Sequence, residues 1–398
     1  MMYNIFMSIP QLKGDLIKYI DSHADEIWGI SSFLFDHPET AFQEHLACEY
    51  LTEKLIADGF SVEKGIGGLP TSFRGIIGEP EPTIAILAEY DALPGLGHAC
   101  GHNLIAASAI GAGMALNHLN NRPPGQIQII GTPAEEGGGG KILLAESGVF
   151  DQVQAAMMFH PASKNIVTRG SLASSRLKLE FFGKASHAAA APQDGINALD
   201  ALLLTFNNIN AIRQTLEPRD RIAGIITHGG EACNIIPAYT AAKFSIRAST
   251  AKRRDELIQR VIICARAGAD AIGCQLKYHI SPGYKEIIPN PILAKLFSAN
   301  LSALGRFVVA PDPDERMGST DMGDLSHLIP CLHPYLETVP ISVAGHTQEF
   351  ADLCLSAPAR KAVMDAVKAL ALTALDLLAD PDYLIQSRST LDDYLSQN

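Results

Sequence analysis

The 398-residue sequence is short of aromatic and basic residues, and each shortage excludes a class of protein. It has one tryptophan, 7% aromatic residues, and 31 Lys+Arg against 43 Asp+Glu, so its formal net charge is −12 at pH 7. Nucleic acids and anionic membranes attract basic surfaces, so this charge argues against a general binder of either. Seven cysteines, odd in number and scattered over a long chain, do not form the pattern of a disulfide framework.

Long apolar runs are also missing. The longest, residues 104–116, is shorter than the roughly 20 residues that a membrane-spanning helix needs. Residues 1–10 carry neither the basic start nor the apolar core of a secretory signal. We therefore expect no membrane partner, no nucleic-acid partner and a cytoplasmic location.

The composition, 47% hydrophobic and 19% charged, is typical of a globular protein, and the length predicts about two domains. We expect an α/β fold whose larger domain comprises residues 1–172 and 287–398. Residues 173–286 differ from the flanking sequence in the order of their expected elements, which is strand, helix, strand, strand, helix, strand. This order predicts an inserted α+β sandwich. The corresponding ranges are 175–182, 197–216, 221–228, 239–248, 254–272 and 275–280.

In the larger domain, the pattern predicts two helices within residues 11–58 and a helix from 104 to 119, with Asn103 as its N-cap. A last long helix is expected at 356–378. Four apolar segments are interpreted as strands: 83–87, 126–131, 153–159 and 340–345.

Residues that can bind a metal follow each of these four segments. They are Cys100 and His102 after the first, Glu135 and Glu136 after the second, His160 after the third and His346 after the fourth. Ligands of open α/β sheets bind outside the carboxyl ends of the strands. We therefore expect these side chains to converge at one edge of the sheet.

A thiolate and an imidazole are good zinc ligands, and Gly101 permits the bend that lets Cys100 and His102 face one point. The pair alone is equally compatible with a buried free cysteine beside a loop histidine. Glu135 and Glu136 are adjacent acids in an extended segment, where successive side chains point opposite ways. One can then be a ligand and the other a general base, although adjacent acids on a loop are often merely solvated.

Several segments together resemble one known family, that of the aminoacylase and glutamate-carboxypeptidase metallopeptidases. They are AEYDALPGLGHACGHN, TPAEEGGGGK, FHP, GKASHAAAAP, GGEACNIIP and GSTDMGDLS, at 88–103, 132–141, 159–161, 183–192, 229–237 and 318–326. Within the family they are similar to the amidohydrolase branch. AEYD in place of ADMD, and Asn103 in place of Asp, are closer to p-aminobenzoyl-glutamate hydrolases and β-alanyl-lysine dipeptidases than to hippurate hydrolases.

The resemblance implies a mixed-sheet, zinc-peptidase-like catalytic domain with two divalent ions per subunit, zinc or manganese. It assigns the metal ligands to Cys100, His102, Glu136, His160 and His346. It makes Glu135 the general acid/base and gives Asp91 the task of orienting a ligand. The thiolate favours zinc, while imidazole and carboxylate accept either metal.

The inserted domain is, by the same resemblance, a dimerisation or lid domain, and we expect a homodimer. His187 corresponds to a histidine that in relatives reaches the partner subunit's active site and stabilises the oxyanion. Asn234 and Arg247 match positions that hold the substrate's carbonyl or carboxylate.

The expected reaction is metal-assisted hydrolysis of the amide bond in a small carboxylated substrate: an N-acyl amino acid, an aminobenzoyl-glutamate or a dipeptide. Two alternatives stay open from the sequence. One is a non-catalytic, metal-stabilised binding or partner subunit of such a hydrolase. The other is a thiol hydrolase that uses Cys100.

Overall fold

The computed structural model describes residues 8–312, 315 and 317–397. The chain divides into two compact units. Unit 1 combines Met1–Gly170 with Ile287–Asn398, and unit 2 is Ser171–Glu286. Among the described residues, no helix is both long and apolar enough to cross a membrane.

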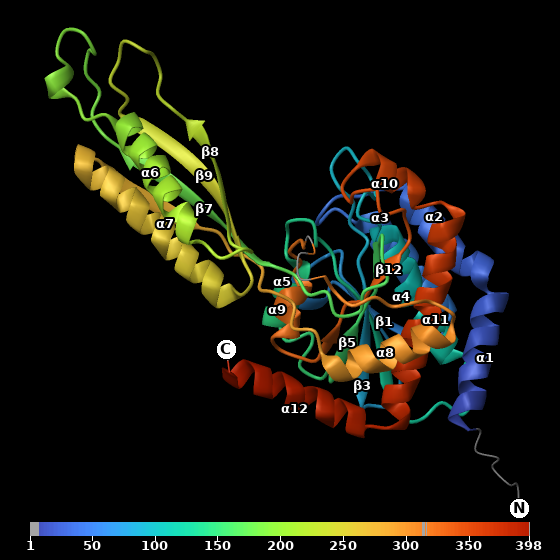
Figure 1. Cartoon of the computed structure of the whole chain (residues 1–398). Coiled ribbons are helices and arrows are strands. Elements are labelled where there is room, and N and C mark those ends of the chain that lie inside the picture. Colours follow the sequence, from blue (N-terminus) through green and yellow to red (C-terminus); the bar gives the residue numbers. More distant parts are fainter. Residues whose placement is uncertain (1–7, 313–314, 316, 398) are drawn as a thin grey trace, which may run out of the picture. The chain divides into compact units, whose positions relative to one another are not determined.

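Unit 1 is built on a mixed six-stranded sheet in the order β1-β2-β4-β3-β5-β11 (Figure 1). Strands β4, β3, β5 and β11 are parallel, and β1 and β2 are antiparallel additions at one side. The strands are β1 Ser61–Lys64, β2 Phe73–Gly78, β3 Thr83–Ala88, β4 Gln126–Gly131, β5 Ala155–Met157 and β11 Cys331–Leu332. All six residues of β3 are buried, as expected of a parallel strand covered on both faces.

Helix α4, His102–Asn117, is the centre of this unit: every residue from His102 to Leu116 is buried. It packs against β3 and against α2, Ala24–Asp36, and α11, Ala357–Ala379. Its small residues allow this close packing; a Cβ added at Gly111 would lie 2.9 Å from Ile27 Cγ2. The other elements of unit 1 are α1 Ile9–Ser22, α3 His45–Ala57, η1 Ile66–Gly68, α5 Gly140–Glu146, β6 His160–Ala162, α8 Pro291–Ala303, α9 Met322–Ser326, β12 Tyr335–Glu337, α10 Gln348–Leu353 and α12 Asp382–Gln397.

Unit 2 is an antiparallel four-stranded sheet in the order β10-β7-β9-β8, with α6 and α7 packed on it (Figure 1). Its elements are β7 Ala173–Phe182, η2 Pro192–Asp194, α6 Ala198–Ile212, η3 Arg213–Thr215, β8 Arg221–His228, β9 Tyr239–Ala248, α7 Ala251–Ile272 and β10 Gln275–Ile280. A separate apolar core, which includes Phe181, Leu202, Phe244 and Val261, joins sheet and helices. Both units together confirm the expected α/β class with an inserted α+β sandwich.

Three local predictions were wrong. Residues 11–58 form three helices rather than two, because the chain breaks between α1 and α2 at His23. The N-cap of α4 is Gly101, whose φ of 78° suits glycine, whereas Asn103 lies inside the helix and donates to Ser31 Oγ at 2.9 Å.

The third error concerns residues 340–345, which are not a strand. They form turns, and the side chain of Ile341 is 73% exposed. His346 is therefore placed by a loop, and only three of the four predicted strand ends exist. The short parallel partners are instead β11 beside β5 and β12 beside β6.

Candidate metal centre

The carboxyl ends of the central parallel strands carry most of the candidate ligands. The loop after β3 leads to Cys100 and His102, the loop after β4 contains Glu135 and Glu136, and His160 begins β6 just after β5. Neighbouring parallel strands end at the same edge, so these loops meet. The backbone N–H of His346 donates to Ala99 O at 2.9 Å, which ties the fifth residue to the same loop.

The donor atoms of these residues form three triplets, each with all its atoms within 4.8 Å of one another. The triplets are Cys100–His102–His160, Cys100–Glu136–His346 and His102–Glu135–Glu136. Cys100 Sγ lies 3.6 Å from His160 Nε2, and Glu136 Oε1 lies 3.4 Å from His346 Nε2. Cys100, His102 and Glu136 each belong to two of the three triplets, so the donors are numerous enough and close enough to hold more than one cation.

Two buried atoms in this cluster lack a hydrogen-bond partner: His102 Nε2 and Glu136 Oε1. They lie 3.9 Å apart. A buried polar atom left without a partner costs about 1–3 kcal/mol, so such atoms need an explanation. A cation between them provides one, and the thiol, imidazole and carboxylate donors are those that zinc or manganese takes.

Asp91 orients two residues of the cluster, His102 and Glu136. Its Oδ1 accepts a hydrogen bond from His102 Nδ1 at 2.8 Å, and its Oδ2 accepts one from the backbone N–H of Glu136 at 2.9 Å. Burial raises the pKa of Asp91, but the charge and hydrogen bond of His102 outweigh it and lower that pKa overall. The carboxylate therefore stays ionised and directs Nε2 of His102 at the cluster.

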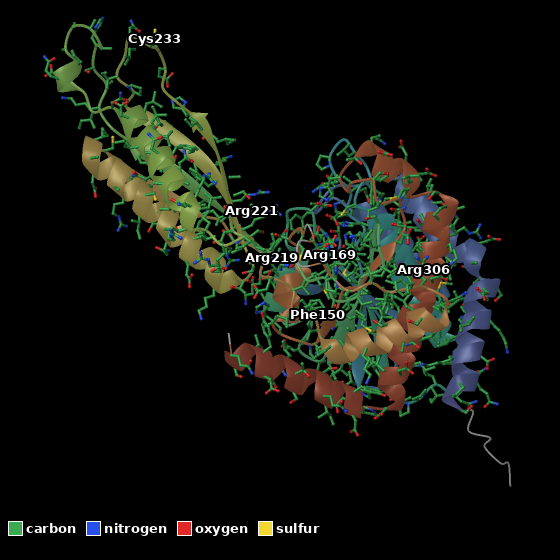
Figure 2. All side chains as sticks on the ribbon, in the orientation of Figure 1. Phe150, Arg169, Arg219, Arg221, Cys233 and Arg306 are labelled. Atoms are coloured by element: carbon green, nitrogen blue, oxygen red, sulfur yellow. The ribbon has the colours of Figure 1, made fainter. Side chains whose placement is uncertain are left out.

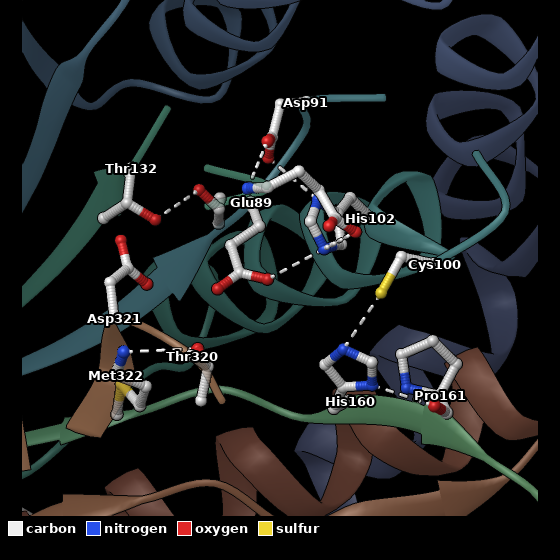
Figure 3. Close-up of polar contacts among 12 residues, drawn as sticks. Glu89, Asp91, Cys100, His102, Thr132, His160, Pro161, Thr320, Asp321 and Met322 are labelled. Carbon is white, nitrogen blue, oxygen red and sulfur yellow. Dashed lines mark hydrogen bonds and ion pairs between the residues drawn. The ribbon is translucent and has the colours of Figure 1, made fainter. Parts of the chain in front are cut away.

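Burial determines the protonation of Cys100 and His160. It raises the pKa of the Cys100 thiol far above its usual range, so without a cation the sulfur stays protonated and is a poor nucleophile. It lowers the pKa of His160 to about 4, which keeps this imidazole neutral. Nδ1 of His160 donates to Pro161 O at 2.8 Å, leaving Nε2 to face Cys100 (Figure 3).

Glu135 is nearly buried, with 9% of its surface exposed. Burial first, and then the charges of Glu89 and Asp321, raise its pKa well above the usual range. Its loop is fixed by Glu44, whose Oε1 accepts the backbone N–H of Ala134 at 2.9 Å. A carboxyl group that holds a proton readily is suited to general acid/base chemistry.

Next to this cluster lies a buried ionic group that sequence reasoning missed, which consists of Glu89, Lys141 and Asp321. Lys141 Nζ lies 2.5 Å from Glu89 Oε1 and 2.7 Å from Asp321 Oδ1. All three side chains are 0–1% exposed. Each belongs to a motif quoted above, but a single lysine after four glycines carries no signal of its burial.

The remaining predicted residues lie in unit 2 and form no single group there. His187 and Asn234 are close, because His187 forms a bridge with Ile235 and Ala188 N–H donates to Asn234 O at 3.0 Å. Arg247 stands near the far end of β9, opposite Arg221. Eight strand steps from Tyr239 to Arg247 span about 26 Å. Figure 2 shows Cys233 and Arg221 at opposite ends of the unit.

Comparison with solved structures places this fold in a known class. The structure aligns with the Bacillus subtilis YXEP protein, described as a dinuclear metal binding peptidase from the M20 family, with a TM-score of 0.71, 21% identity, and coverage of 90% of this chain and 99% of that one. An aminobenzoyl-glutamate utilization protein from Klebsiella pneumoniae aligns with a TM-score of 0.69, 18% identity, and coverage of 91% and 98%. Residues 169–270 match the family model of the peptidase dimerisation domain.

Sequence comparison then shows the family. Xaa-Arg dipeptidase of Mus musculus is 37% identical over 391 residues, which cover 94% of this chain and 90% of that protein. The enzyme of Homo sapiens is also 37% identical, with the same coverage. One of the subunits of p-aminobenzoyl-glutamate hydrolase from Escherichia coli (strain K12) is 32% identical, over 74% of this chain and 64% of that one. The chain belongs to the M20 family of metallopeptidases, hydrolases that act on C–N bonds, and the resemblance found in the motifs is confirmed.

Proposed function

We propose that the protein hydrolyses the amide bond of a small carboxylated substrate: a dipeptide, an N-acyl amino acid or an aminobenzoyl-glutamate. The observation that carries this proposal is the position of Glu135. Its neighbour Glu136 belongs to the triplet with Cys100 and His346, and both glutamates form a triplet with His102; of the two, Glu135 has a pKa raised by burial. A cation site and a proton-accepting group are thus side by side, as hydrolysis requires.

Two divalent ions, zinc or manganese, would be held by Cys100, His102, Glu136, His160 and His346. The ions would polarise the amide carbonyl and make water more acidic. The three overlapping triplets of donor atoms support two ions rather than one. The thiolate would form on binding, because a cation lowers the pKa that burial has raised.

Glu135 carries the proton in this proposal. It removes a proton from the attacking water and then delivers it to the departing amine nitrogen, so one carboxyl group acts as base and acid in turn. The raised pKa favours the first of these steps, since burial makes the Glu135 carboxylate a stronger base toward the water.

Unit 2 would supply contacts to the substrate. Arg247 would bind a free carboxylate through its planar guanidinium. Asn234, which lies beside His187 and far from Arg247, would hold a carbonyl group in the same active site as His187. His187 would stabilise the oxyanion, in the active site of the second subunit of a homodimer formed through this unit. The match of residues 169–270 to the dimerisation domain supports the dimer.

A substrate panel tests the function. Purified protein, with and without a chelator, is assayed against dipeptides ending in arginine or lysine, β-alanyl dipeptides, p-aminobenzoyl-glutamate and N-acyl amino acids. Turnover that the chelator abolishes and zinc or manganese restores is the expected result. The names of the two 37%-identical relatives put the arginine dipeptides first in the panel.

The same panel separates the two alternatives. A binding or partner subunit would carry metal and turn over nothing. A thiol hydrolase would ignore the chelator and lose activity on alkylation, which the raised pKa of the half-buried Cys100 argues against.

A further inference from the structure

Glu89 presents a carboxylate oxygen to the cluster that none of the predicted ligand assignments uses. The residue follows β3 directly and is 1% exposed. Its Oε1 is bound to Lys141, but its Oε2 is buried, accepts no hydrogen bond and lies 3.4 Å from His102 Nε2. Figure 3 shows this ion-pair contact between Glu89 and His102; the nitrogen has no hydrogen-bond partner.

The 3.4 Å between Glu89 Oε2 and His102 Nε2 is the distance expected between two ligands of one ion. Two donors, each about 2.1 Å from a tetrahedrally coordinated cation, are about 3.4 Å apart. Glu136 Oε1 and His346 Nε2, in another part of the cluster, have the same separation of 3.4 Å. Glu89 and His102 are therefore spaced as a pair of ligands.

The charges of the buried ionic group also favour Glu89 as a metal ligand. Within the group of Glu89, Lys141 and Asp321, one buried ammonium faces two buried carboxylates, so one negative charge is left over. Asp321 cannot direct that charge at the cluster, because its Oδ1 is bound to Lys141 Nζ and its Oδ2 to Lys141 N–H at 2.9 Å. The oxygen of the group that remains available is Glu89 Oε2. A buried negative charge is costly unless a positive charge meets it.

We propose that Glu89 is a further ligand of the cation beside His102, and that Lys141 holds it in place through its other oxygen. This inference rests on the proposed metal site. It adds a third protein anion to Cys100 and Glu136, so that two divalent ions meet three negative charges instead of two. Lys141 restrains the carboxylate, because its ammonium binds Glu89 Oε1 and is itself held by Asp321 Oδ1 at 2.7 Å.

Metal titration tests the inference. Zinc and manganese are titrated into metal-free protein against a competing chelator, and cobalt is titrated separately to follow the absorption band of a Cys100 thiolate bound to it. We expect Glu89→Gln to weaken one of two binding steps at least tenfold and to leave the other within twofold. Glu89→Asp, which keeps the charge beside Lys141 but withdraws it from His102, should weaken the same step.

Asp321→Asn is the matched control. It disturbs the same buried ionic group but removes no atom that faces His102. Equal weakening in Asp321→Asn and Glu89→Gln would overturn the inference in favour of a purely structural group, and so would unchanged affinity in both Glu89 variants. Failure of the proposed site itself looks different: wild type then binds neither zinc nor manganese, which overturns both proposals.

Discussion

Asp91 lies 2.8 Å from Nδ1 of His102, and this one contact decides which imidazole nitrogen faces the cluster. The second oxygen of the same carboxylate accepts the backbone N–H of Glu136 at 2.9 Å. Asp91 therefore aligns candidate ligands from two different loops. Their relative placement depends on a residue that itself binds no metal in this proposal.

Replacement of Asp91 by Asn should lower metal affinity about 10–100-fold, the usual cost of losing a partner of this kind. The amide has one acceptor where the carboxylate has two, so either His102 or the Glu136 N–H loses its acceptor. Competition titration measures the affinity, with exposed Asp36→Asn as control. An affinity within twofold of wild type would show that Asp91 does not orient the site.

The Glu135→Gln variant should retain both ions and lose turnover by about 10²–10⁴-fold, the range typical of general acid/base groups. Glutamine keeps the shape but cannot exchange the proton. Elemental analysis and kcat on the best substrate of the panel measure the two effects. Glu136→Gln is the neighbouring comparison and should lose metal as well. Full activity in Glu135→Gln would remove Glu135 from its role.

Substitution of Cys100 by Ser should reduce metal content at both positions, because Cys100 belongs to two of the three triplets, one with His102 and His160 and one with Glu136 and His346. A hydroxyl is a much weaker ligand for zinc than a thiolate. Elemental analysis after dialysis measures the stoichiometry. The exposed Cys233→Ser should bind as wild type does. Unchanged metal in Cys100→Ser would contradict its assignment.

His98 should make the metal-free protein less stable in mild acid. It is buried, its Nε2–H donates to Leu34 O at 3.0 Å, and burial first, then the charge of His102, lowers its pKa to about 4. In the unfolded chain the pKa is about 6.5. Between these values the unfolded state binds more protons, so the free energy of unfolding rises with pH from 4 to 6.5, by about 3 kcal/mol at most.

Urea unfolding of metal-free protein at several pH values between 4.5 and 7 measures this slope. His98→Gln keeps a donor for Leu34 O and should flatten the profile relative to wild type. The exposed His45→Gln should keep the wild-type slope. An identical slope in wild type and His98→Gln would show that another group is responsible.

The apolar patterns predicted the elements that depend on local sequence. Residues 126–131, 221–228 and 239–248 are strands with the predicted bounds. The residues at three strand ends also converge as predicted, because parallel strands leave little freedom in where their ends lie. His346 reaches the cluster from a turn instead, held by the backbone bond to Ala99, a long-range contact that no periodicity encodes.

The buried ionic group could not be predicted for a related reason. Glu89, Lys141 and Asp321 come from three segments distant in sequence, and a charged residue is normally expected at the surface. Only the packing of α5 and α9 brings Lys141 between the two acids. Asn103 shows the same limit, since a residue typical of an N-cap is here buried one position inside α4.

The entry and exit of unit 2 are joined to each other: Ser174 and Tyr284 exchange two backbone hydrogen bonds of 2.9 Å each. The polypeptide therefore leaves unit 1 and returns to it through two adjacent strands of chain. The whole of unit 2 therefore connects two neighbouring points of the chain, as a surface turn would. Replacement of unit 2 by a short glycine linker should therefore leave a chain that still contains the metal cluster. For the same reason, unit 2 can be exchanged as a whole for the corresponding domain of a relative.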